Sequence, residues 1–152
     1  MRRAAGGFSM IEVLMALLVL GVGLLGLALL QTVNLRYTKS AQQRTQAINL
    51  ATELLDTIRA NRSELDAYTA ITTASFPATV PQPGGCAMGA ALTSANNIAR
   101  WRCEVNEALG PAATANVVYT AATNVVSVQV TWSESTLPTL LNAGTIRLET
   151  QI

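Results

Sequence analysis

Residues 7–30 read GFSMIEVLMALLVLGVGLLGLALL, and this stretch decides how the chain folds. Its last eighteen residues, Val13 to Leu30, carry no polar side chain. A helix of this run is about 27 Å long, close to the hydrocarbon thickness of a bilayer. A buried core helix does not need eighteen unbroken apolar residues. The run therefore predicts a helix that can span a membrane.

The two flanks of this run predict its orientation and its retention. Arg2 and Arg3 precede the run and place the N-terminus in the cytoplasm by the positive-inside rule. The far flank, residues 31–36, reads QTVNLR and lacks the small-residue cleavage pattern of a secretory signal. We therefore expect the helix to stay in the mature protein, with the rest of the chain outside the inner membrane.

Glu12 is the anomalous residue of this stretch. A carboxylate at the edge of an apolar span is disfavoured by a few kcal/mol unless it finds a partner. Such residues are functional candidates, although a carboxylate in the headgroup region can also be without a role. Both interpretations stay open from the residues alone.

The amino-acid composition excludes several classes of partner and of catalytic site. Ten Lys and Arg against nine Asp and Glu give a net charge of +1, which indicates no nucleic-acid or acidic partner. Without residues 1–7, two Arg are lost and the net charge becomes −1. The chain has no His and two Cys, so neither a His/Cys metal site nor a His-dependent nucleophile is expected. We expect no enzyme activity, no metal and no cofactor.

The chain beyond the apolar run predicts a continuing helix. Residues 31–62 contain neither Pro nor Gly, and Ala51, Leu54, Leu55 and Ile58 fall on one helical face. We expect one helix from about Ser9 to Asn61.

Residues 70–89, rich in Thr, Ala, Pro and Gly, predict a loop that leads into Cys86. In an oxidising compartment Cys86 and Cys103 predict a structural disulfide, the alternative being two free thiols. Residues 94–109 fit a strand by alternation, or a helix with Thr93 or Ser94 as N-cap and Gly110-Pro111 as stop. Length and stop signals favour the helix.

The last forty residues predict an antiparallel sheet. Three segments have strand character, at 116–120, 124–132 and 145–152, and short connections join them. We expect their apolar face to pack on the second part of the long helix. Trp101 and Trp132 are expected in this core rather than in a ligand site. The fold class is α+β, with a long N-terminal helix packed on a small antiparallel sheet domain and a short extra helix.

The first thirty residues together resemble the class III signal of type IV prepilins and pseudopilins. A short basic leader ends in Gly7, Phe8 follows, and Glu12 precedes the apolar run. The resemblance implies a pilin-like fold and cleavage by a prepilin peptidase between Gly7 and Phe8. It also implies methylation of the new terminus and a role for Glu12 as partner of a neighbouring subunit's N-terminus.

The resemblance implies a domain organisation for the whole chain. Residues 1–7 would be a cytoplasmic leader and 8–30 the transmembrane and assembly helix. Residues 31–62 would continue the helix, and 63–152 would form a periplasmic globular domain. The expected location is the inner membrane, followed by the pilus on the cell surface.

Other stretches of the sequence resemble, less specifically, the minor pilins of the type IV pilus modification (PilV-like) group. They are Gly23 to Ala28 with Gln31, Ile58 to Arg62, Trp101 with Leu109, and Val128 to Trp132. The order Leu109-Gly110-Pro111 departs from the Leu-Pro-Gly turn that is frequent in that group.

The resulting expectation is a minor pilin that supports filament initiation at or near the tip. Its partners would be other minor and major pilins, the prepilin peptidase and the assembly machinery of the inner membrane. The alternatives are a minor pseudopilin of a type II secretion system and a membrane-tethered module that binds a surface or DNA. Arg100 and Arg102 are the residues that a DNA-binding module would use, although a solvated helix face explains two Arg better.

Overall fold

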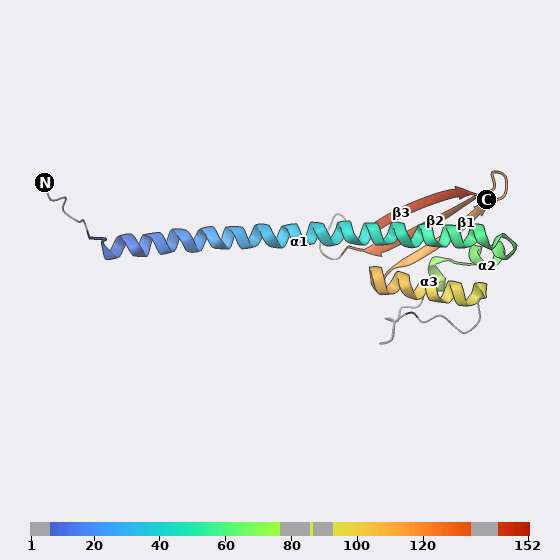
Figure 1. Cartoon of the computed structure of the whole chain (residues 1–152), viewed down its shortest axis with the longest axis horizontal. Helices are drawn as coiled ribbons and strands as arrows, with labels where there is room; N and C mark the ends of the chain where they lie inside the picture. Colours follow the sequence, from blue (N-terminus) through green and yellow to red (C-terminus); the bar gives the residue numbers. More distant parts are fainter. Residues whose placement is uncertain (1–6, 77–85, 87–92, 135–142) are drawn as a thin grey trace. The chain divides into compact units, whose positions relative to one another are not determined.

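The computed structural model describes residues 7–76, 86, 93–134 and 143–152. The first six residues of the predicted leader and most of the loop predicted at 70–89 lie outside the described residues. The chain forms two compact units, Met1–Thr38 and Lys39–Ile152. Figure 1 gives the order of the elements along the chain.

A single helix, α1 (Met10–Ala60), confirms the long helix predicted from the sequence. It ends where the Asn61 amide donates to the carbonyls of Thr57 and Ile58, at 3.1 Å each. The Asn61 side chain also donates to the Thr57 carbonyl, at 2.9 Å. By length and composition α1 is able to cross a membrane.

The second unit uses one face of α1 as part of its core. The buried residues of α1 lie three or four positions apart, which places them on one side of a helix. They are Ala47, Ala51, Leu54, Leu55 and Ile58. The four predicted from periodicity are all confirmed, and Ala47 extends the face by one turn.

Three short elements follow α1, and none of them was predicted from the sequence. They are the 3-10 turns η1 (Arg62–Glu64) and η2 (Thr73–Ser75), and between them the helix α2 (Leu65–Thr69). A five-residue helix is too short for hydrophobic periodicity to reveal it. The segment is nevertheless structural, because Tyr68 of α2 is fully buried.

Helix α3 (Ser94–Leu109) confirms the helical interpretation of this segment and shows that the strand interpretation was wrong. The Thr93 hydroxyl accepts a hydrogen bond from the backbone amide of Asn96 at 3.3 Å and caps the first turn. At the other end Gly110 has a φ of 99° and donates to the Asn106 carbonyl at 2.9 Å. Glycine adopts this left-handed conformation without a side-chain clash, which ends the helix.

The sheet is antiparallel, with strand order β1-β2-β3, as predicted. Its strands are β1 (Thr114–Thr120), β2 (Val125–Ser133) and β3 (Ala143–Gln151). The predicted bounds were wrong by up to two residues. Asn124, predicted as the start of a strand, has a φ of 53° and lies in the turn, a conformation that Asn tolerates.

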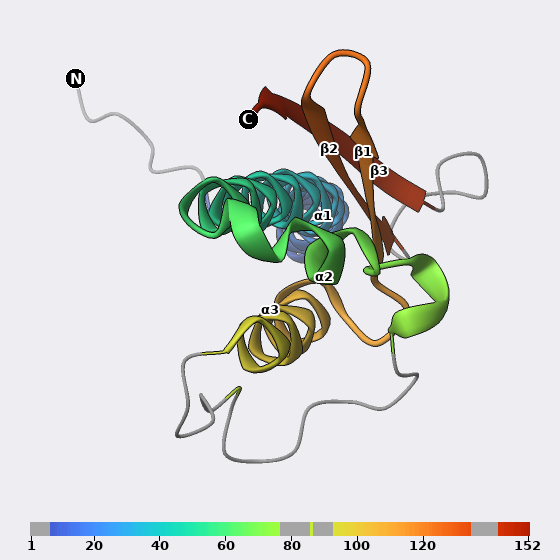
Figure 2. The ribbon, with the colours of Figure 1, turned by 90° about the vertical axis from the view of Figure 1, so that its right-hand side faces the viewer.

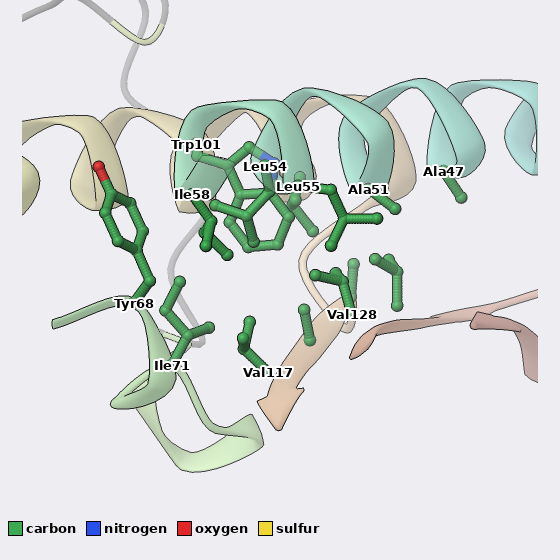
Figure 3. Close-up of a cluster of buried hydrophobic side chains, with 14 of the residues drawn as sticks. Ala47, Ala51, Leu54, Leu55, Ile58, Tyr68, Ile71, Trp101, Val117 and Val128 are labelled. Carbon is green, nitrogen blue, oxygen red and sulfur yellow. The ribbon is translucent and has the colours of Figure 1, made fainter. Parts of the chain in front are cut away.

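The core of the second unit lies between the sheet, α3 and the second part of α1 (Figure 2). Alternate residues of β2 point into it, and Trp101 and Trp132 are 2% and 1% exposed, which confirms both as core residues. Figure 3 shows the buried side chains that meet there, with Leu54 beside Trp101 and Val117 near Ile71.

Gly144 of β3 is a point of close approach in this core. It pairs with Trp132 across the strands. A Cβ added at Gly144 would lie 2.2 Å from the Trp132 ring, well inside contact distance. The indole therefore occupies the space that any other residue at 144 would need.

Candidate processing and assembly site

The predicted cleavage position lies immediately before α1. Gly7 and Phe8 precede the helix, and both are exposed, Phe8 to 82%. A Cβ added at Gly7 would meet nothing within 4 Å. The Gly7–Phe8 peptide bond is therefore open to another protein in the described structure.

The first turn of α1 positions Glu12. The Ser9 carbonyl accepts hydrogen bonds from the amides of Glu12 and Val13, at 3.1 and 3.3 Å. A carboxylate in the first turn interacts favourably with the positive end of the helix dipole. Within the described residues Glu12 forms no salt bridge.

The helix that follows presents apolar side chains on every side. Between Val13 and Leu30 its large hydrophobic residues are 48% to 74% exposed. The apolar window of the helix is 0% buried. This surface is stable only against lipid or other apolar helices, because water makes exposure of so large an apolar area unfavourable.

The cysteine pair is the third predicted feature. Cys86 and Cys103 form a disulfide with a Cα–Cα distance of 5.5 Å, so the alternative of two free thiols is wrong. Cys103 belongs to α3, and the bond ties residue 86 to the middle of that helix. The two cysteines are far from residues 7–12 in sequence, and their role is to hold the second unit together.

Arg100 forms ion pairs that were not predicted from the sequence. Its guanidinium joins α3 to α1 by an ion pair with Glu53 of α1, at 2.8 Å, and also pairs with Glu104 of its own helix, at 2.6 Å. The hydrogen bond to Glu53 is the main reason that the pKa of Arg100 is raised, and Glu104 adds to the effect. Sequence periodicity could not find the Glu53 pair, because its partners are 47 positions apart.

Arg102 is also engaged within the second unit. Its guanidinium carbon lies 5.5 Å from the centre of the Phe76 ring, a cation–π contact. The Phe76 ring in turn meets Trp101 edge-on, with centroids 6.1 Å apart. Arg100 and Arg102 are therefore not a merely solvated helix face, because Arg100 pairs with two carboxylates and Arg102 stacks on Phe76.

The described residues, 7–76, 86, 93–134 and 143–152, contain no group of three His, Cys, Asp or Glu that could hold a metal ion. Taken together, the features define a class of protein: a chain with an exposed Gly7-Phe8 sequence, an exposed apolar helix able to cross a membrane and a disulfide-bonded α+β domain.

Two family models match this chain. Residues 2–28 match the prokaryotic N-terminal methylation motif, and residues 29–103 match a family described as type IV pilin Tt1218. The two stretches adjoin and together cover 102 of the 152 residues. The chain thus resembles type IV pilins over residues 29–103 and carries the N-terminal methylation motif before them. No curated protein and no solved structure matches it significantly.

The likeness bears on the site. A type IV pilin is a structural protein and not an enzyme, and the likeness points to processing by a prepilin peptidase and assembly into a pilus. The methylation motif and the apolar helix together are the features of an inner-membrane prepilin. The matched motif includes Gly7, Phe8 and Glu12.

Proposed function

We propose that this protein is a minor pilin of a type IV pilus that supports initiation of the filament at or near its tip. One observation carries the proposal: α1 begins at Met10, with one residue between it and an exposed Gly7-Phe8 sequence, and its apolar first part is uncovered in the described residues. Such a helix needs lipid before assembly and other helices after it. Its partners are other minor pilins, major pilins and the assembly machinery of the inner membrane.

In this proposal the N-terminus is processed before assembly. Prepilin peptidase hydrolyses the Gly7–Phe8 bond, releases residues 1–7 and leaves a free amine on Phe8, which is then methylated. Residues 8–30 hold the protein in the inner membrane, and the helix continues from there to Ala60. Residues 63–152 form the periplasmic domain. The exposed position of the bond supports this proposal.

Glu12 acts as the assembly residue in the proposal. Its carboxylate pairs with the Phe8 amine of a neighbouring subunit once lipid is replaced by helices. Each charge lowers the desolvation cost of the other, and such a pair selects the register between subunits even where it adds little stability. The absence of a salt bridge to Glu12 in the described residues supports an external partner.

A pair of variants tests the role of Glu12. Glu12→Ala should still be cleaved after Gly7 but should enter filaments less, as measured by immunoblotting of sheared pili. Glu12→Asp keeps the charge and should retain more incorporation than Glu12→Ala. Wild-type amounts of Glu12→Ala in sheared pili would contradict the role.

A gene deletion tests the function as a whole. Surface pili, twitching motility and secretion of exoproteins are measured side by side in the deletion strain. We expect fewer pili and reduced twitching, with normal secretion. Normal piliation with lost secretion would instead identify a minor pseudopilin of a type II secretion system.

A further inference from the structure

The last turns of the first unit, directly after the apolar run, have the chemistry of a membrane interface. The run from Val13 to Leu30 gives about 27 Å of helix, about 3 Å less than a bilayer's hydrocarbon core. Thr32 can make up this difference, because its hydroxyl donates to the Ala28 carbonyl at 3.0 Å. Its only side-chain polar group is therefore satisfied within the helix at the depth where the hydrocarbon ends.

Arg36 and Tyr37 follow one turn later. Arg36 lies six residues beyond Leu30, about 9 Å farther along a helix, which places its Cα at the outer edge of the headgroup layer. Arg36 is exposed, and Tyr37 is 61% exposed. In the part of the chain that the structure describes, neither side chain has an ion pair or a side-chain hydrogen bond.

The direction of the helix aims both side chains at the membrane. Side chains on an α-helix lean toward its N-terminus. Because the N-terminus is cytoplasmic in the proposed function, on which this orientation rests, Arg36 and Tyr37 lean back from the periplasm toward the headgroups. A guanidinium matches phosphate oxygens with two parallel hydrogen bonds, and tyrosine is enriched at membrane–water interfaces.

The charge pattern around these residues selects anionic lipids. No acidic residue occurs between Glu12 and Glu53, whereas Arg36, Lys39 and Arg44 fall in that interval. The outer flank of the span is thus purely basic, and basic flanks attract anionic headgroups over a distance of about a Debye length.

We propose that Arg36 and Tyr37 form a binding site for the headgroups of anionic phospholipids in the periplasmic leaflet of the inner membrane. The Arg36 guanidinium binds the phosphodiester, and the Tyr37 ring lies among the headgroups with its hydroxyl toward water. The site fixes the depth of the helix before assembly. The proposal goes beyond pilus assembly, because it concerns the protein while it is still in the membrane.

The experiment measures lipid selectivity directly. The full chain is reconstituted in phosphatidylcholine vesicles that contain a small fraction of spin-labelled lipid, either phosphatidylglycerol or phosphatidylcholine. Electron spin resonance then gives the ratio of the two association constants at the protein surface. The wild type should prefer phosphatidylglycerol, and 1 M salt should weaken this preference because it screens exposed charges.

Matched variants locate the site. Arg36→Gln should lower the ratio by roughly fivefold, the factor expected for one basic residue at a membrane surface. Arg36→Lys should keep most of the preference. Arg44→Gln removes the same charge eight residues farther from the span and should change the ratio little. Arg2 and Arg3 are present in every variant and contribute equally to the measured ratio. A difference in the ratio between variants therefore arises from the residues after the span.

The predicted depth of Tyr37 in the membrane is tested by fluorescence quenching. A tryptophan at position 37 (Tyr37→Trp) should be quenched most strongly by lipids brominated near the headgroup. Equal ratios for wild type and Arg36→Gln would overturn the proposal, and so would an equal loss in Arg44→Gln. Unchanged lipid selectivity combined with lost piliation in Arg36→Gln would also overturn it, because Arg36 would then contact neighbouring subunits instead. None of the lipid measurements depends on pilus formation, so their failure would leave the proposed function standing.

Discussion

The two parts of α1 differ in how their apolar residues are covered. Both carry many apolar residues, but those between Val13 and Leu30 are exposed, whereas five residues between Ala47 and Ile58 are buried in the second unit. The second part has its partners within the chain. The first part has apolar residues on every side, so no single packed face could cover it.

This contrast explains how one helix can serve both a membrane and a filament. The second unit has its own core, a disulfide and ion pairs within the chain. In the proposed function the first part exchanges lipid for other helices. Substitutions should therefore affect the stability of the second unit and the partners of the first.

The largest effect on stability is expected at Trp101. Trp101→Ala removes a ring that is 2% exposed and a hydrogen bond from the indole to the Leu50 carbonyl at 2.8 Å. It should lower the free energy of unfolding by about 3–5 kcal/mol. Denaturation of the full chain in detergent, followed by the fluorescence of Trp132, measures the change.

Leu25→Ala is the control for Trp101→Ala. Leu25 is 74% exposed, so its truncation should change the unfolding of the second unit by less than about 0.5 kcal/mol. Equal losses in the two variants would contradict the separation of α1 into two parts with different partners.

Removal of the disulfide should have the next largest effect. The double variant Cys86→Ala, Cys103→Ala lacks a bond between two residues that are 17 positions apart. Its free energy of unfolding should be lower by roughly 3 kcal/mol, because the unfolded chain gains conformational entropy. Wild type under reducing conditions should show a similar loss, and the double variant should not respond to reductant. A reductant-insensitive wild type would show that the bond does not stabilise the unit.

Gly144→Ala tests the close approach of β3 to Trp132. The new Cβ would lie 2.2 Å from the ring, so the indole or the strand must move, at a cost of about 1–3 kcal/mol. Ala143→Ser changes the exposed neighbouring residue and should leave the unfolding midpoint unchanged. Thermal unfolding by near-ultraviolet circular dichroism compares the two variants.

The smallest effect is expected at Arg100. Arg100→Gln breaks ion pairs with Glu53 and Glu104 and should cost about 1 kcal/mol, because the Arg side chain is only 22% exposed. Arg147→Gln breaks a pair in which both side chains are about half exposed and should cost almost nothing. A larger loss in Arg147→Gln than in Arg100→Gln would refute this ranking.

Sequence predicted what depends on local pattern. The unbroken run after Glu12 and the spacing of Leu54, Leu55 and Ile58 predicted α1, and alternation in β2 predicted the inward position of Trp132. The stop at Gly110-Pro111 predicted where α3 ends. These features follow from periodicity and backbone preference, which neighbouring residues determine.

Features that depend on distant partners could not be predicted. The Arg100–Glu53 pair and the contact of Arg102 with Phe76 arise only after α3 packs in the second unit. The five-residue α2 is likewise fixed by burial of Tyr68 and not by its own periodicity. The processing residues are different again, because another protein would act on them.

The mature N-terminus tests the central claim most directly. Mass spectrometry of the protein purified from cells with an active prepilin peptidase should find a first residue of N-methylated Phe8 and no residue before it. A protein that still begins at Met1 in those cells would contradict processing after Gly7, and with it the proposed path from membrane to pilus.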